Sequence, residues 1–216
     1  MKQICIIGLS QFGSHLCREL ASMGCEVIAL DIDEKKVADI QRFVQKALII
    51  DVTNFDALKA VIDPDIDEVI VSLGKTMEQS ILCVVHLKKL NIKRIRVKAI
   101  SDDHANILKT LGADEIIFPE RDIAEMIAAK IMNPNLIDFI PLSQGYVVME
   151  INTPPAFYDR TLLELSLPSK HNVFVIAVRE KYKRSFHFLP DPASKLTSSS
   201  ILLLIGKEEA IKKLAE

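Results

Sequence analysis

Three small residues near the start of the chain have the types and spacing of a phosphate-binding turn. The segment reads Gly8-Leu9-Ser10-Gln11-Phe12-Gly13, which is the dinucleotide-binding fingerprint G-x-G-x-x-G with Ser10 in place of the middle glycine. The middle glycine lets the backbone approach a pyrophosphate. Serine is the smallest replacement with a side chain, and its hydroxyl could donate to a phosphate. The segment therefore predicts an anion site made of backbone N–H groups and a helix N-terminus.

The flanking patterns are those of a buried strand and a helix. Residues 4–7 are an unbroken apolar run, typical of a strand buried on both faces. After the turn, apolar residues recur at helical intervals as far as Met23, and Gly24 lies where a helix would stop. The turn is therefore expected between a strand and the helix that follows it.

A second apolar run, residues 27–30, ends at Asp31, which Ile32 and Asp33 follow. Asp31 lies 18 residues after Gly13, close to the spacing of about 20 at which an acidic residue holds ribose hydroxyl groups. The structural alternative is that Asp31 or Asp33 caps a helix beginning near Glu34.

Strand and helix patterns alternate as far as residue 119. Further apolar runs typical of strands occupy residues 47–50, 68–73, 95–100 and 115–118, and helical periodicity occupies residues 77–88 and 103–111. Thr53 and Asp56 have capping-box spacing for another helix. The alternation predicts an α/β fold in residues 1–119, with a Rossmann-like, doubly wound parallel sheet.

In such sheets a ligand binds beyond the carboxyl ends of the strands. Besides the glycine turn and residues 31–33, the candidate nucleotide contacts at that edge are Asp51, Val52, Thr53, Ser72, Leu73, Gly74, Gln79 and Lys98. Lys98 would act as a point charge for distal phosphates, although a solvated lysine at a strand end is the alternative.

The rest of the chain has a different pattern. Residues 120–144 contain a helix with an apolar side and a very apolar connector, residues 136–142. We expect this segment to form a dimer contact, and packing on the same subunit is the alternative. Residues 145–216 predict a small α+β domain with strands at 146–151, 173–178, 186–189 and 201–205, a capped helix at 161–165 and a closing helix at 208–214.

Composition excludes several classes of protein. With 27 basic and 29 acidic residues, the chain has a net charge of −2 and no basic stripe, so no nucleic-acid partner is expected. No apolar run approaches the roughly 20 residues of a membrane span, and no signal-peptide pattern is present, so a cytoplasmic protein is expected. The four cysteines have no C-x-x-C spacing and are expected as free, mostly buried thiols.

No set of residues with catalytic spacing stands out. A serine nucleophile elbow needs G-x-S-x-G, and here the last glycine comes one residue late. A nucleotide site without acid–base residues indicates a sensor that changes conformation on binding, not an enzyme. The alternatives are an NAD-dependent oxidoreductase with a small C-terminal domain, and a scaffold with an empty site.

Several segments resemble one protein family over the whole chain. They are residues 7–13, 29–33, 97–99, 112–120 and 202–206, and they are similar to the cytoplasmic gating subunit of bacterial Trk/Ktr potassium uptake systems. That subunit has an RCK N-terminal domain followed by an RCK C-terminal domain. Residues 1–119 and 145–216 would be these two domains.

The resemblance implies a homodimer that assembles into an octamer-like ring at the inner face of the cell membrane, beneath a membrane-embedded potassium transporter. ATP or ADP, or NAD or NADH, would bind the N-terminal domain and gate the transporter. Asp31 would hold the ribose, residues 51–53 would flank the adenine, and Lys98 would face the phosphates. Glu120 would hold a divalent or monovalent cation beside them.

The chain departs from this family at two positions of the turn. Ser10 replaces a glycine, and Gln11 stands where close relatives often carry an arginine that reaches a neighbouring subunit's phosphate. In some relatives an arginine of the C-terminal domain binds cyclic di-AMP. The matching segment, residues 167–171, has no arginine, so cyclic di-AMP is not expected as a ligand.

Overall fold

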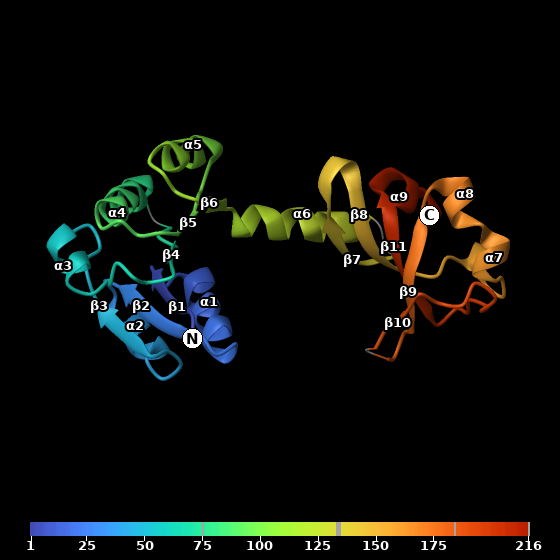
Figure 1. Ribbon diagram of the computed structural model, residues 1–216, viewed down its shortest axis with the longest axis horizontal. Coiled ribbons are helices and arrows are strands. Elements are labelled where there is room, and N and C mark those ends of the chain that lie inside the picture. The colour runs from blue at the N-terminus through green and yellow to red at the C-terminus, as the bar shows by residue number, and fades with distance from the viewer. Residues whose placement is uncertain (75, 133–134, 184, 216) are drawn as a thin grey trace. The chain divides into compact units, whose positions relative to one another are not determined.

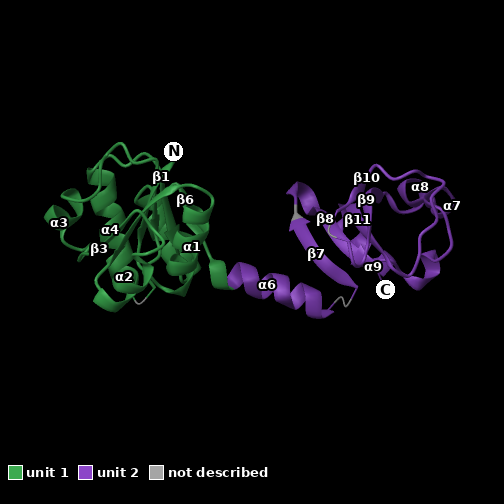
Figure 2. Ribbon diagram, turned by 90° about the horizontal axis from the view of Figure 1, so that it is seen from below, with its two compact units in different colours: residues 1–120 green, residues 121–216 purple. Residues whose placement is uncertain are grey.

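The structure, a computed structural model, describes residues 1–74, 76–132, 135–183 and 185–215. The chain forms two compact units, Met1–Glu120 and Arg121–Glu216 (Figure 2). The first unit contains the predicted parallel sheet, and the second contains an antiparallel sheet.

The first unit is built on six parallel strands in the order β3-β2-β1-β4-β5-β6 (Figure 1). This is the strand order of a Rossmann fold, whose switch point lies between β1 and β4. The prediction of a doubly wound sheet is therefore confirmed. The strands are β1 (Gln3–Ile7), β2 (Glu26–Asp31), β3 (Lys46–Ile49), β4 (Glu68–Val71), β5 (Ile95–Lys98) and β6 (Glu115–Ile117).

Helices cover both faces of this sheet. They are α1 (Gln11–Ser22), α2 (Glu34–Ile40), α3 (Phe55–Lys59), α4 (Met77–Lys89) and α5 (Asp102–Thr110). Along β1, Ile4 and Ile6 belong to the core formed with α1 and α2, whereas Cys5 and Ile7 belong to the core formed with α3, α4 and α5. This alternation explains why residues 4–7 of β1 are all apolar and are buried on both faces of the sheet, as predicted.

The N-caps of two helices show which of the candidate residues in the sequence caps each helix. Asp33 caps α2, where its carboxylate accepts from the amides of Lys35 and Lys36, so Asp31 is left for another role. The capping box expected from Thr53 and Asp56 was wrong. Asn54 is the cap of α3, and its side chain accepts from the Ala57 amide.

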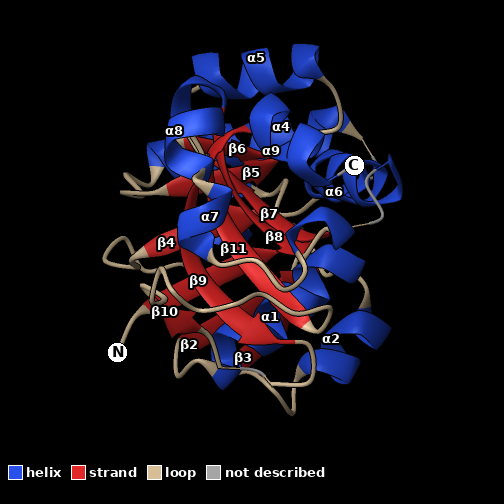
Figure 3. Cartoon of the chain, turned by 90° about the vertical axis from the view of Figure 1, so that its right-hand side faces the viewer, coloured by secondary structure: helices blue, strands red, loops and turns tan. Residues whose placement is uncertain are grey.

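The second unit is built on a five-stranded antiparallel sheet in the order β10-β9-β11-β8-β7, with α9 packed on β8 and β11 (Figure 3). Helix α6 (Pro119–Met132) begins at the end of the first unit. The other elements are β7 (Leu136–Pro141), η1 (Ser143–Gly145), β8 (Tyr146–Asn152), η2 (Pro155–Phe157), α7 (Leu162–Leu165), α8 (Leu167–His171), β9 (Phe174–Glu180), β10 (His187–Phe188), β11 (Ser200–Lys207) and α9 (Glu208–Ala215).

Strand β7 corrects the expected connector at residues 136–142. It pairs with β8 through the turn Ser143–Gly145, in which Gln144 and Gly145 have φ values of 60° and 75°. The segment is apolar because it completes the sheet of the second unit. Helix α7, in contrast, has the predicted capping box between Thr161 and Glu164.

The cysteines are free, and three of the four are buried. Burial raises the pKa of the Cys17 and Cys83 thiols to about 12. Among the described residues, no helix combines the length and apolar character needed to cross a lipid bilayer.

Candidate functional site

The glycine turn between β1 and α1 is closely packed against the end of β4. Gly8 has a φ of +93°, and a Cβ atom there would lie 2.7 Å from the Ser72 carbonyl oxygen. A Cβ atom on Gly13 would lie 2.1 Å from the Gly8 carbonyl oxygen. Both contacts are too short for any side chain, so the turn requires glycine at these two positions.

Ser10 is the N-cap of α1. Its hydroxyl oxygen accepts from the Gly13 amide at 3.2 Å, and the Leu9 amide donates to the Asp31 carboxylate at 2.6 Å. Within the described part of the chain, the amides of Gln11 and Phe12 donate no hydrogen bond. These amides, at the positive end of the α1 dipole, are suited to an anion.

Asp31, at the end of β2, is 8% exposed. Besides the Leu9 amide, its carboxylate accepts from the Asp33 amide at 2.9 Å and lies 3.6 Å from the Lys36 ammonium. A carboxylate has about four acceptor positions, so Asp31 retains acceptor capacity for ribose hydroxyl groups. The same side chain therefore holds the glycine turn and is placed to hold a sugar.

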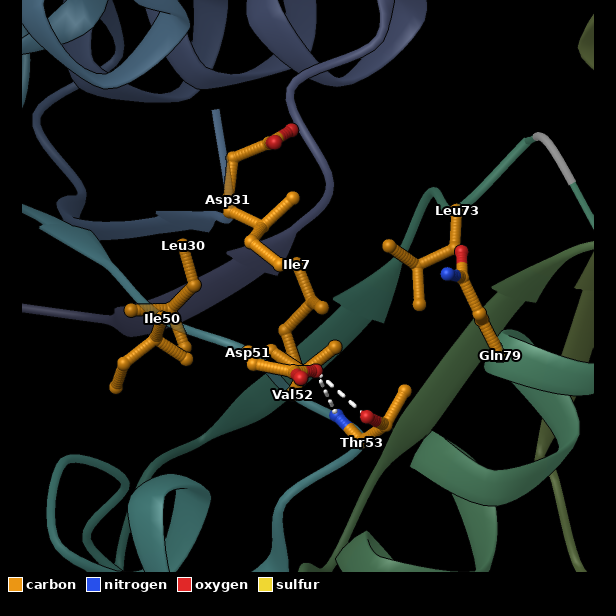
Figure 4. Close-up of a pocket in the computed structure, with 10 residues that line it drawn as sticks. Ile7, Leu30, Asp31, Ile50, Asp51, Val52, Thr53, Leu73 and Gln79 are labelled. Atoms are coloured by element: carbon orange, nitrogen blue, oxygen red, sulfur yellow. Dashed lines mark hydrogen bonds between the residues drawn. The ribbon is translucent and has the colours of Figure 1, made fainter. Parts of the chain in front are cut away.

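A pocket opens next to Asp31, between the ends of β1, β2, β3 and β4 (Figure 4). Leu73 and Gln79 lie across it from Ile50 and Asp31. The pocket combines apolar strand ends with acidic and amide groups, as a site for a base and a sugar would. Its lining residues are Ile7, Leu30, Asp31, Ile32, Ile50, Asp51, Val52, Thr53, Leu73 and Gln79.

The loop after β3 is fixed by Asp51. Its carboxylate accepts from the Thr53 hydroxyl at 2.6 Å and from the Thr53 amide at 2.9 Å. The Thr53 hydroxyl and amide hold the pKa of Asp51 below its usual range. Beneath this loop, His86 approaches the Val52 carbonyl oxygen at 3.4 Å and packs edge-on against Phe55.

Two further predicted residues are joined to the turn. The Ser72 hydroxyl lies 2.8 Å from the Ser10 hydroxyl, and the Ser72 amide donates to the Ile7 carbonyl oxygen at 2.7 Å. Gly74 is exposed, and a Cβ atom there would meet no other atom within 4 Å. The described structure therefore gives Gly74 no evident role.

Lys98 and Glu120 form an ion pair. The Lys98 side chain is 9% exposed and the Glu120 side chain is 70% exposed. The hydrogen bond from Lys98 holds the pKa of the Glu120 carboxyl below its usual range. A phosphate approaching Lys98 would therefore meet a lysine that already has a carboxylate partner.

Among the described residues, no group of three or more His, Cys, Asp or Glu side chains could hold a metal ion. Glu120 alone does not make a cation site, so the expected cation would need ligands from outside these residues.

Ile7, Leu30 and Ile50 also line the pocket, and Lys36 pairs with Asp31, although none of these four residues was predicted to belong to the site. The positions of Ile7, Leu30 and Ile50 could nevertheless be predicted, since each of these residues ends or directly follows a predicted strand. At the same edge lie all seven predicted residues that line the pocket: Asp31, Ile32, Asp51, Val52, Thr53, Leu73 and Gln79.

The described residues fit an adenine nucleotide in three respects. The turn supplies free amides for phosphate, Asp31 supplies acceptors for ribose, and the pocket supplies an apolar surface for the base.

Curated relatives match the chain over nearly its whole length. It is 35% identical over 214 residues to "Ktr system potassium uptake protein C" of Bacillus subtilis (strain 168), covering 98% of this chain and 95% of that protein. It is 31% identical over 212 residues to "Ktr system potassium uptake protein A" of the same organism, with coverage of 98% and 95%.

Solved structures share the fold at lower identity. The GsuK RCK domain superposes with a TM-score of 0.55 at 22% identity, covering 98% of this chain and 45% of that one. The GsuK channel bound to NAD gives a TM-score of 0.56 at 22% identity, covering 99% and 38%. Family models match residues 4–119 as a TrkA-N domain and residues 146–216 as a TrkA-C domain. The chain therefore belongs to the TrkA family and is homologous to the Ktr potassium uptake proteins.

Proposed function

We propose that this chain is a regulatory subunit of a potassium uptake system, and that it senses an adenine nucleotide in its first unit. The observation that carries the proposal is the pocket beside Asp31, joined to a glycine turn with free amides. The full-length likeness to the Ktr potassium uptake proteins supports the transport role. The ligand would act by binding one conformation of the chain more tightly than another.

Each part of the nucleotide contacts a different group of residues. The first turn of α1 binds phosphate through the amides of Gln11 and Phe12, Asp31 holds the ribose, and residues 50–53 with Leu73 and Gln79 enclose the adenine. Lys98 faces the distal phosphates once its pairing with Glu120 is rearranged. ATP, ADP, NAD and NADH remain the candidate ligands, and one fold neighbour is described as bound to NAD.

The partner in this proposal is a membrane-embedded potassium transporter, as the names of the relatives suggest. The chain would work in the cytoplasm, as a homodimer assembled into an octamer-like ring, and would be held at the membrane by that partner. A cation beside the phosphates would use Glu120 together with ligands from a neighbouring subunit.

A thermal-shift panel of ATP, ADP, NAD and NADH tests the sensing function. A ligand at about 100 times its dissociation constant should stabilise the first unit by about 2.7 kcal/mol. No shift with any of the four would contradict nucleotide sensing. An NAD-dependent oxidoreductase would instead reduce NAD with a substrate, which absorbance of NADH would reveal.

Asp31→Ala tests the site itself. The variant should lose the nucleotide shift, and it should lose about 1–3 kcal/mol of stability because the buried Leu9 amide loses its acceptor. Asp33→Ala is the matched control, since it removes a carboxylate two residues away that caps α2. That control should cost about 0.5–2 kcal/mol and keep the shift. An unchanged shift in Asp31→Ala would remove Asp31 from the site.

A further inference from the structure

Ser72 is a buried hydroxyl placed directly beneath the glycine turn. Its residue is 1% exposed, its amide is fixed on the Ile7 carbonyl oxygen, and its hydroxyl lies 2.8 Å from the Ser10 hydroxyl. A Cβ atom built on Gly13 would lie 3.3 Å from the same Ser72 oxygen. The Ser72 oxygen therefore lies close to both Ser10 and Gly13 of the turn.

The positions of the hydrogen-bond partners indicate which serine donates. Within the described part of the chain, the Ser72 oxygen has Ser10 as its hydrogen-bond partner and no other. If Ser10 donated to Ser72, the Ser72 proton would be buried without an acceptor, which is unfavourable. If Ser72 donates, the Ser10 oxygen accepts from both Ser72 and the Gly13 amide. The Ser10 proton is then free for an acceptor outside the pair.

We propose, building on the nucleotide site above, that Ser72 is a positioning residue that makes the Ser10 hydroxyl a phosphate donor. In a G-x-G-x-x-G turn the middle glycine admits the phosphate to the backbone. Here the Ser10 side chain takes that place and supplies a hydroxyl in return. A hydroxyl that already accepts two hydrogen bonds is polarised to donate to an anionic oxygen. The pair therefore recognises the phosphate part of the ligand and not its adenosine part.

The test compares the binding of ADP, NAD and adenosine to the wild type, Ser10→Ala, Ser72→Ala and the double variant by titration calorimetry. Each single variant should bind the phosphorylated ligand of the wild type about tenfold more weakly. Because the two hydroxyls act as one donor, the double variant should lose no more than Ser10→Ala alone. Adenosine should bind all four proteins equally. Ser22→Ala is the matched control, since it removes a hydroxyl at the other end of α1 and should leave every affinity unchanged.

Three results would overturn the inference and leave nucleotide sensing standing. They are an unchanged affinity in Ser72→Ala, losses that add in the double variant, and an equal loss for adenosine. If Ser72→Ala does not fold, the affinities of Ser10→Ala show whether the Ser10 hydroxyl contacts a phosphate. If the wild type binds none of the three compounds and neither ATP nor NADH shifts its thermal unfolding, the proposed function itself fails.

Discussion

Glu68 is a buried carboxylate at the start of β4. It lies at the amino ends of the strands, whereas the glycine turn lies at their carboxyl ends. Its side chain is 4% exposed and pairs with Lys2 at 2.9 Å and with Arg96 at 2.9 Å. Burial alone would raise the pKa of Glu68, but the two cations outweigh burial and lower it below its usual value. Arg96 also bonds to Glu115, so one network joins the N-terminal edges of β4, β5 and β6.

Glu68→Gln should lower the free energy of unfolding at pH 7 by about 1–3 kcal/mol, because Lys2 and Arg96 lose their shared anion. A carboxyl whose folded pKa is depressed stabilises the fold above its unfolded pKa of about 4.3 and loses that contribution as the pH falls through its folded pKa. The difference between variant and wild type should therefore shrink below about pH 4.3 in urea unfolding. Glu115→Gln, which removes a more exposed partner of Arg96, should cost less than about 1 kcal/mol.

At the scale of elements, the glycine turn is the joint that brings β1, α1 and β4 together. Gly13→Ala should destabilise the first unit by more than about 2 kcal/mol and abolish the nucleotide shift, because its Cβ atom would overlap the Gly8 carbonyl oxygen. Gly24→Ala is the control, since it has a φ of +85° and no atom within 4 Å of its Cβ position. That control should cost only about 1 kcal/mol of backbone strain and keep the shift. Thermal unfolding with and without nucleotide separates the two variants.

Elements defined by local pattern were predicted well from the sequence. Strand β1 was readable because both of its faces are apolar, and the cap of α7 was readable because Thr161 and Glu164 lie three residues apart. The cap of α3 was misassigned, because Thr53 and Asn54 are neighbouring residues of similar capping preference. Only the three-dimensional path of the chain decides between them.

Strand β7 was missed for a different reason. Its apolar residues resemble a covered connector, and its partner β8 becomes evident only if residues 143–145 are recognised as a hairpin turn. The candidate site likewise contains residues that could be predicted from the sequence and residues that could not. Asp31 and Asp51 could be predicted because charged residues at strand ends are informative, whereas Ile7 and Leu30 have the residue types of any core position.

At the scale of the whole molecule, α6 carries an apolar stripe that the described residues of its own chain leave exposed. Ile123, Ile127 and Ile131 recur at intervals of four and lie on one side of the helix, and each remains about half exposed or more. Toward the end of α6, Lys130 bonds to Asp138 of β7, which fixes that end within the second unit. An exposed apolar stripe of this kind is suited to packing on the same helix of a second copy.

Ile127→Asp should therefore weaken self-association by at least about tenfold, since it places a charge in the centre of the stripe. Light scattering over a range of concentrations should show a lower mass for the variant than for the wild type. Met23→Asp, at an exposed apolar residue after α1, should leave the mass unchanged.

Because the first unit has its own core, the nucleotide shift should survive in Ile127→Asp if each site is complete within one chain. Loss of the shift together with the lower mass would mean instead that the neighbouring subunit contributes a residue to the site. An unchanged mass would exclude this stripe from the expected dimer contact.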